Sequence, residues 1–163
     1  MILIDTRDKL DKIQHITKYF DRNKIAYDRT KLYIGDYQRA DNPLLLIDRK
    51  QNLLEVANNA IEKGGRFKKE LDRLEVIGGK MYILVEEKLD SIDDVTGWMP
   101  PCKKDGTPYI KMSGTTLYKY MMSWQYKHNI EFVFCHKNGT ARKITELLEV
   151  TEHGANRNKA LYI

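Results

Sequence analysis

The sequence has little cysteine, and its two cysteines, Cys102 and Cys135, lie far apart. They form no Cys-x-x-Cys pair, and with the four histidines they make no set with zinc-ligand spacing. This pattern excludes a zinc finger and a disulfide scaffold. In a reducing compartment we expect both residues to be free thiols.

Long apolar runs are also missing. A membrane-spanning helix needs roughly 18 or more apolar residues in succession, and the sequence contains no such run. The first residues, Met1 to Asp5, carry a charge too early for a signal peptide. We therefore expect a cytoplasmic protein without a membrane partner. A composition rich in Lys, Asn, Ile and Tyr is typical of an AT-rich genome, such as that of a phage or mobile element.

The chain has ordinary globular proportions. Its 163 residues, of which 42% are hydrophobic and 31% charged, suit one domain with a real core. The formal net charge is +5 and the sequence pI is about 9.1. A basic balance favours a polyanionic partner such as nucleic acid, although many basic proteins bind none.

Apolar periodicity predicts an α/β fold, with a central mixed β-sheet flanked by helices. We predict a single domain over 1–150, a long loop or insertion at 88–112, and a polar, basic tail at 151–163. The expected strands lie at 2–4, 25–34, 44–47, 81–85 and 130–135, and the expected helices at 8–23, 53–61, 67–77, 115–128 and 140–150.

One stretch carries a chemical pattern. Gly35-Asp36-Tyr37 follows the strand expected at 25–34, and Asp48-Arg49-Lys50 ends the apolar run Leu44 to Ile47. Residues i and i+2 of a strand share a face, so Asp48 and Lys50 point one way and Arg49 the other. If the strands at 25–34 and 44–47 are paired neighbours, Asp36 and Asp48 meet at the end of the sheet.

This arrangement suits phosphodiester hydrolysis. Two carboxylates are hard oxygen ligands for Mg²⁺, and the lysine can orient a water or stabilise an anionic transition state. Next to metal and substrate, desolvation is expected to lower the pKa of Lys50. The spacing alone leaves another interpretation open, in which Asp48 and Lys50 are solvated residues just beyond a strand.

The chain resembles the nuclease domain of the XPF family of structure-specific DNA endonucleases, which is restriction-endonuclease-like. That family has an aspartate after its first strand, then Gly-Asp-Tyr, then Glu-Arg-Lys closing the central strand. The matching segments here are Ile4 to Asp8, Gly35 to Tyr37, Asp48 to Lys50, Gly65 to Leu74 and Met81 to Glu86. The resemblance covers about residues 1–150, less 88–112.

The resemblance implies roles for individual residues. Asp5, Asp36 and Asp48 would form the acidic set, with Asp36 and Asp48 closest to Mg²⁺ or Mn²⁺, and Lys50 would be the catalytic lysine. Arg49 would contact DNA phosphate or lock the site, and its backbone carbonyl would reach the metal. Two further residues, Arg7 and Arg66, would contact phosphate.

The sequence departs from the family at three points. Asp48 stands where the family has glutamate and is one methylene shorter. Leu54 stands where the family favours an acid, and the adjacent Glu55 is the nearest replacement. The helix-hairpin-helix module that follows the nuclease domain in the family has no counterpart, so we expect a stand-alone domain.

Two segments are candidates for contacts with partners. Lys103 and Lys104, in the predicted loop, would bind DNA if the loop embraces it; a solvated insertion is the alternative. In the helix at 115–128, a stripe of Leu117, Met121 and Trp124 indicates a core or dimer contact. The resembled domains pair through this region, so we expect a homodimer.

We therefore predict an Mg²⁺- or Mn²⁺-dependent endonuclease that cuts branched or flapped DNA. Two alternatives stay open. One is a catalytically inactive DNA-binding or scaffold partner of the same fold, which Leu54 favours. The other is a junction resolvase or a sequence-specific endonuclease.

Overall fold

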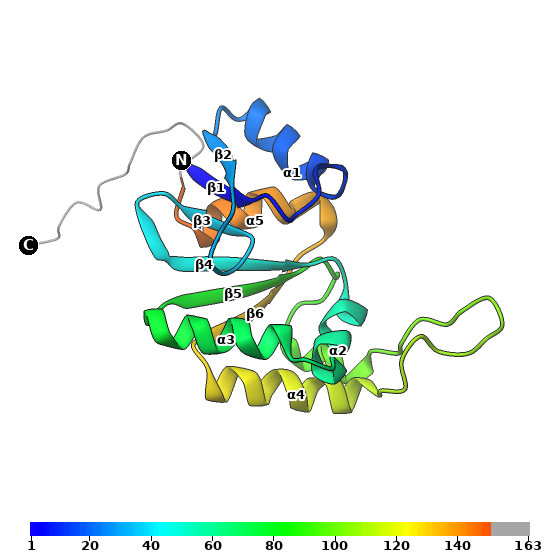
Figure 1. Cartoon of the computed structure of the whole chain (residues 1–163). Coiled ribbons are helices and arrows are strands. Elements are labelled where there is room, and N and C mark those ends of the chain that lie inside the picture. Colours follow the sequence, from blue (N-terminus) through cyan, green and yellow to red (C-terminus); the bar gives the residue numbers. More distant parts are fainter. Residues whose placement is uncertain (151–163) are drawn as a thin grey trace, which may run out of the picture.

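The computed structural model describes residues 1–150; the predicted tail at 151–163 lies outside them. A six-stranded mixed sheet, in the order β2-β1-β3-β4-β5-β6, lies between two layers of helices (Figure 1). The strands are β1 (Ile2–Asp5), β2 (Tyr27–Thr30), β3 (Tyr37–Arg39), β4 (Asn42–Lys50), β5 (Lys80–Val85) and β6 (Ile130–Phe134). The α/β class with a central mixed sheet is thereby confirmed.

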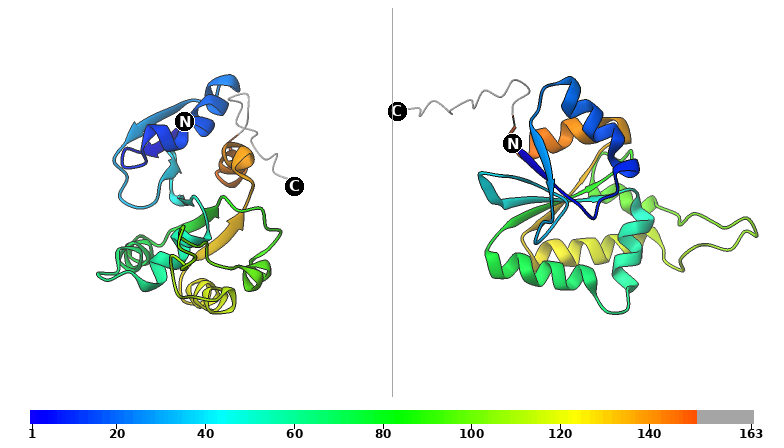
Figure 2. Two further views of the ribbon diagram at one scale, coloured as in Figure 1. Left: turned by 90° about the vertical axis from the view of Figure 1, so that its right-hand side faces the viewer. Right: turned by 45° about the horizontal axis from the view of Figure 1, so that its top comes forward.

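Five α-helices and two short 3₁₀ helices cover the sheet within residues 1–150. They are α1 (Leu10–Arg22), α2 (Leu53–Ile61), α3 (Arg66–Ile77), η1 (Ile92–Gly97), α4 (Gly114–Lys127), η2 (Lys137–Gly139) and α5 (Thr140–Leu147). Helices α1 and α5 lie on one face, and α2, α3 and α4 on the other (Figures 1 and 2). None of these helices is long and apolar enough to cross a membrane.

Successive side chains of β4 point into two different hydrophobic clusters, one on each face of the sheet. Leu46 belongs to a cluster formed with α2, α3 and α4, whereas Ile47 belongs to a cluster formed with α1 and α5. Both side chains are almost fully buried. Because successive residues of a strand alternate, Asp48 and Lys50 lie on the Leu46 side and Arg49 lies on the Ile47 side.

The neighbour of β4 differs from the expected one. The predicted strand at 25–34 is limited to β2, at the far edge of the sheet, and the antiparallel partner of β4 is β3, which we did not predict. Gly35 has φ +70°, and the Asp36 amide donates to the Ile47 carbonyl at 2.7 Å. This bend brings Asp36 to β4. A three-residue strand is too short to show periodicity in the sequence.

The expected loop at 88–112 is partly regular. Ser91 and Asp94 form a capping box at η1, and Val95, Ile110 and Met112 are buried in the core. Between Val95 and Ile110, a β-bridge from Cys102 to Pro108 closes a loop that projects from the body of the protein (Figures 1 and 2). We call this loop the excursion. The burial of the apolar residues in 88–112 could not be predicted from the sequence, because these residues follow no helical or strand period.

Candidate active site

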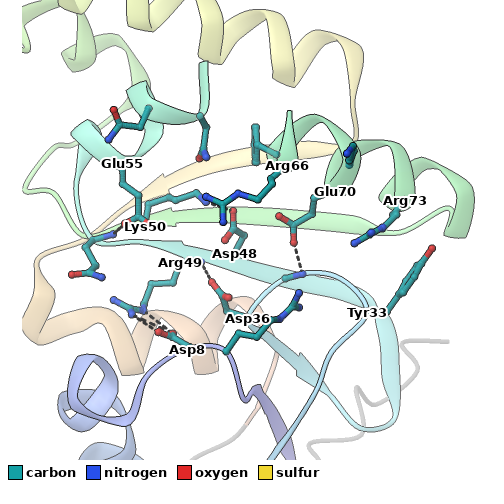
Figure 3. A pocket seen from close by; sticks show the side chains of 17 residues that line it. Asp8, Tyr33, Asp36, Asp48, Arg49, Lys50, Glu55, Arg66, Glu70 and Arg73 are labelled. Atoms are coloured by element: carbon teal, nitrogen blue, oxygen red, sulfur yellow. Dashed lines mark hydrogen bonds and ion pairs between the residues drawn. The ribbon is translucent and has the colours of Figure 1, made fainter. Parts of the chain in front are cut away.

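A cleft of about 670 Å³ opens where β4 ends (Figure 3). Its lining comes from the segments after β1 and before β3, the end of β4, α2 and α3. Five acidic residues line it together with Lys50: Asp8, Asp36, Asp48, Glu55 and Glu70. The two sequence motifs, at 35–37 and 48–50, therefore meet in one concave site.

Asp48 and Lys50 share a face of β4, as predicted. Lys50 Nζ lies 2.8 Å from Asp48 Oδ2, and the two side chains are only 10% and 7% exposed. Nζ also lies 5.4 Å from the centre of the Phe67 ring. Burial disfavours the charge, but the Asp48 and Asp36 carboxylates outweigh it and raise the pKa of Lys50. The expected fall of this pKa is not found in the protein alone, because Asp48 is its direct partner.

Asp36 is fixed by the backbone of β4. The Arg49 amide donates to Asp36 Oδ2 at 2.8 Å. Burial and the neighbouring Asp48 carboxylate hold the pKa of Asp36 well above its ordinary value, although the Arg49 amide opposes this shift. A buried Asp36 carboxylate whose charge is disfavoured beside a second carboxylate forms a site where a cation would be stabilised.

The donor set at this point fits a hard cation. Two carboxylates, Asp36 and Asp48, lie together here, and the buried Asp48 Oδ2 pairs with Lys50 Nζ at 2.8 Å. No group of three His, Cys, Asp or Glu side chains among those residues converges closely enough to hold a metal ion. A cation held by Asp36 and Asp48 would therefore take its other ligands from main-chain, water or substrate oxygens, as Mg²⁺ commonly does.

Arg49 points to the opposite face and is locked there. Its side chain is 3% exposed and pairs with Asp8, at 2.9 Å, and with Glu86. Glu86 Oε2 in turn lies 2.9 Å from His15 Nε2 and accepts from the Thr140 hydroxyl at 2.8 Å. Of the two roles expected for the Arg49 side chain, this network favours locking the site over binding phosphate.

Asp5 does not reach the cleft. Its carboxylate accepts two hydrogen bonds from the Arg7 guanidinium, both at 2.8 Å, and one from the Leu32 amide at 2.7 Å. Burial alone would raise the pKa of Asp5, but the hydrogen bonds from Arg7 and Leu32 lower it. Asp5 thus positions Arg7, whose side chain is 55% exposed and lines the cleft. The Asp5 amide donates to the Asp36 carbonyl at 2.8 Å, so Asp5 adjoins the site through its backbone, although its carboxylate does not line the cleft.

Two of the acids that line the cleft come from helices, Glu55 from α2 and Glu70 from α3. Glu70, on α3, accepts from the Gly35 amide at 2.7 Å, next to Asp36 (Figure 3). Burial and the Asp48 carboxylate raise its pKa. Leu54 packs against the core, and the Glu55 carboxylate accepts from the Gln51 amide at the start of α2. We assigned Glu70 no role from the sequence, because only the packing of α3 beside β4 brings it near Asp48.

Basic side chains rim the acids. Arg66, Lys69 and Arg73 are exposed on α3 and line the cleft; we call them the basic ridge. Their spacing of three and four residues places them on one helical face, a signal that is visible in the sequence. Arg66 also pairs with Glu62. Lys103 and Lys104 are exposed on the excursion and are not among the residues that line the cleft.

Comparison with known proteins identifies relatives of this fold. The model of the ERCC4 domain matches residues 4–147. The structure is similar to XPF from Aeropyrum pernix, with a TM-score of 0.63 and 20% identity over 91% of this chain and 65% of that chain. XPF from Aeropyrum pernix in complex with DNA gives a TM-score of 0.62 and 19% identity over 91% and 62%.

The match to these structures is partial in length, since this chain spans less than two thirds of either one. No curated protein sequence matches it. The family model nevertheless extends over β1 to α5 and includes both motifs of the cleft. The chain belongs to the ERCC4 domain family, and its fold is similar to that of XPF from Aeropyrum pernix.

Proposed function

We propose that this protein is a divalent-metal-dependent DNA endonuclease that hydrolyses phosphodiester bonds in branched or flapped DNA. Family membership supports a nuclease, and the similar XPF structure in complex with DNA supports a DNA substrate. The observation that carries the proposal is the meeting of Asp36, Asp48 and Lys50 in one open cleft, where Lys50 Nζ lies 2.8 Å from Asp48 Oδ2.

Asp36 and Asp48 are the residues that would hold Mg²⁺ or Mn²⁺. When bound, the cation supplies charge neutralisation at the scissile phosphate and lowers the pKa of an attacking water. The Arg49 amide keeps Asp36 in place, and the Arg49 carbonyl, on the same edge of β4, is a further candidate ligand. The products would carry a 5′-phosphate and a 3′-hydroxyl.

Lys50 acts as a charged donor in this proposal. Its raised pKa keeps the ammonium protonated, which suits stabilisation of the anionic transition state better than removal of a proton. Arg7 and the basic ridge surround the acids and would hold the phosphates on either side of the bond that is cut.

A second candidate is an inactive DNA-binding partner of the same fold. The observation in its favour is Leu54, whose packing against the core removes an acid from the position where the resembled family has one. Glu70 offsets this loss, because it brings a carboxylate into the cleft from α3.

A homodimer remains part of the proposal, since Tyr120, Met122 and Tyr126 are exposed on α4.

Cleavage of an end-labelled panel tests the function. The panel contains flap, fork, four-way junction, plain duplex and single-stranded DNA, with Mg²⁺ or Mn²⁺. We expect cutting of the flap and fork, abolished in Asp48→Ala and retained in the matched control Asp72→Ala, which changes an exposed aspartate on α3 outside the cleft. Binding without any cutting by the wild type would support the inactive partner instead.

A further inference from the structure

Tyr33 is an exposed aromatic side chain in a polar cleft. It is 63% exposed and lines the cleft together with Arg73. The Arg73 guanidinium lies over the Tyr33 ring, 5.5 Å from its centre. Figure 3 shows this pair on the side of the cleft opposite Lys50 and Glu55. One face of the ring is thus covered by a cation, while much of the side chain remains open to solvent.

The backbone around Tyr33 is anchored on both sides. Leu32 and Ile34 are buried at 5% and 1% exposure. The Leu32 amide donates to Asp5, and the Gly35 amide donates to Glu70, both at 2.7 Å. Between these two buried residues, the Tyr33 side chain points outward, as its 63% exposure shows. The ring is therefore presented to the cleft by a fixed segment, which lowers the entropy lost when a ligand stacks on it.

A path for a nucleic-acid strand leads to this ring. The basic ridge of Arg66, Lys69 and Arg73 runs along one face of α3, and its last member is the residue that contacts Tyr33. Cations at this spacing suit successive phosphates, and an aromatic face beside them suits a base. Asp36 and Asp48 lie in the same cleft, so a strand on the ridge passes the proposed reaction centre.

We propose that Tyr33, held by Arg73, stacks on an unpaired base next to the bond that is cut. A base inside an intact duplex has both faces covered by its neighbours, so an exposed ring can stack only on an unpaired or terminal base. Tyr33 is then the residue by which the cleft distinguishes a strand with unpaired nucleotides from continuous duplex. This inference rests on the proposed function for the position of the base, but stacking itself needs no cleavage.

Binding without metal tests the stacking directly. The probes are a fluorescent single-stranded oligonucleotide, a flap and a blunt duplex, with 2-aminopurine placed in turn at each unpaired position of the flap. We expect Tyr33→Ala to weaken binding of the single strand and flap about tenfold and of the duplex less than about twofold. Tyr33→Phe, which keeps the ring, retains wild-type binding. Val76→Ala is the control, because Val76 is an apolar side chain that is 83% exposed on the same helix as the basic ridge and lies outside the cleft.

The fluorescence of 2-aminopurine gives a second readout. Stacking predicts quenching at one position in the wild type and in Tyr33→Phe, and no quenching in Tyr33→Ala. Equal binding by the wild type and Tyr33→Ala, an equal loss for duplex and flap, or failure of the wild type to bind single strands would overturn the inference.

The outcome separates this inference from the proposed function. If the wild type cuts DNA in an Asp48-dependent manner but Tyr33→Ala behaves like the wild type, only the stacking role is wrong. If Tyr33 supports selective binding and quenching but no DNA is cut with either metal, the stacking role stands and the nuclease proposal is wrong.

Discussion

The two faces of the end of β4 carry the same kinds of charged side chain, all of them buried, in different surroundings. On the α1 and α5 face, Arg49 is enclosed by Asp8 and Glu86, and every charge has a partner. On the α2 and α3 face, Asp48 and Lys50 pair with each other at 2.8 Å and border an open cleft together with Asp36. Because successive residues of a strand alternate, Arg49 lies on the face that is held by ion pairs, and its two neighbours, Asp48 and Lys50, lie on the face that borders the cleft.

The comparison shows how a buried arginine is linked to an acid of the cleft. The Arg49 side chain is paired with Asp8 and Glu86 on one face of β4, and the Arg49 amide donates to the Asp36 carboxylate at the edge of the same strand. The position of Asp36 therefore depends on a residue whose side chain is held on the other face of the sheet. Substitutions on the two faces should have different consequences, in stability on one and in activity on the other.

The largest expected effect on stability is on the enclosed face. Glu86→Ala removes one partner from each of Arg49, His15 and Thr140, and leaves the buried Arg49 charge partly uncompensated. We expect the free energy of unfolding, measured in urea, to fall by about 3–5 kcal/mol. The control Glu131→Ala breaks an exposed pair with Lys80 and should cost less than about 1 kcal/mol. Equal losses for the two variants would contradict the enclosed network.

The next effect is on catalysis at the open face. Lys50→Met keeps an apolar stem against Phe67 but removes the ammonium beside Asp48. We expect cleavage to fall about 10²–10³-fold, as for the loss of one donor to a developing anion. Binding of Mn²⁺ should persist, because both aspartates remain. Lys68→Met, on the exposed surface of α3 outside the cleft, is the control; cleavage by Lys50→Met at the wild-type rate would exclude the proposed role.

Glu70 sharpens the comparison, because it extends the open face with a residue from α3. Glu70→Gln keeps an acceptor for the Gly35 amide but removes a negative charge near Asp48. We expect Mn²⁺ affinity, measured by calorimetry, to fall about tenfold. Glu75→Gln on the same helix lies outside the cleft and should not change it. Unchanged affinity in Glu70→Gln would mean that its carboxylate only fixes the loop.

The smallest expected effect concerns Asp5, which the resemblance placed in the acidic set. The pKa of Asp5 is lowered in the folded state, so its contribution to stability is present above its ordinary value of 3.8 and is lost as the pH falls through the folded value. Asp5→Asn should therefore destabilise by on the order of 1 kcal/mol at pH 7. This difference should shrink below about pH 4. Loss of Mn²⁺ binding in this variant would return Asp5 to the metal site.

Much of this arrangement was accessible from the sequence. The apolar run before Asp48 and the period of two predicted the strand, its burial and the shared face of Asp48 and Lys50, and the structure confirms that face. The positions of the five helices follow their apolar periodicity. The sequence could not show that β3, rather than the strand at 25–34, pairs with β4, because that pairing depends on the bend at Gly35.

The remaining features depend on contacts between distant segments. The enclosure of Arg49 requires α1, β5 and α5 to come together at Glu86. The entry of Glu70 into the cleft requires α3 to pack beside β4. Asp5 has the right residue type at the end of a strand, but its hydrogen bonds to Arg7 and Leu32 appear only in three dimensions. Residue type and spacing thus predicted the residues of the open face. The partners of Arg49 on the enclosed face could be identified only from the packing of distant segments.

Titration of Mn²⁺ into the protein, followed by electron paramagnetic resonance, tests the difference between the two faces most directly. Wild type, Asp48→Asn and Glu86→Ala are compared under conditions where all three remain folded. The account predicts that Asp48→Asn stays folded but does not bind Mn²⁺. It predicts that Glu86→Ala still binds Mn²⁺ but has a lower free energy of unfolding. Undiminished binding by Asp48→Asn, or loss of binding only in Glu86→Ala, would contradict the assignment of the chemistry to the open face of β4.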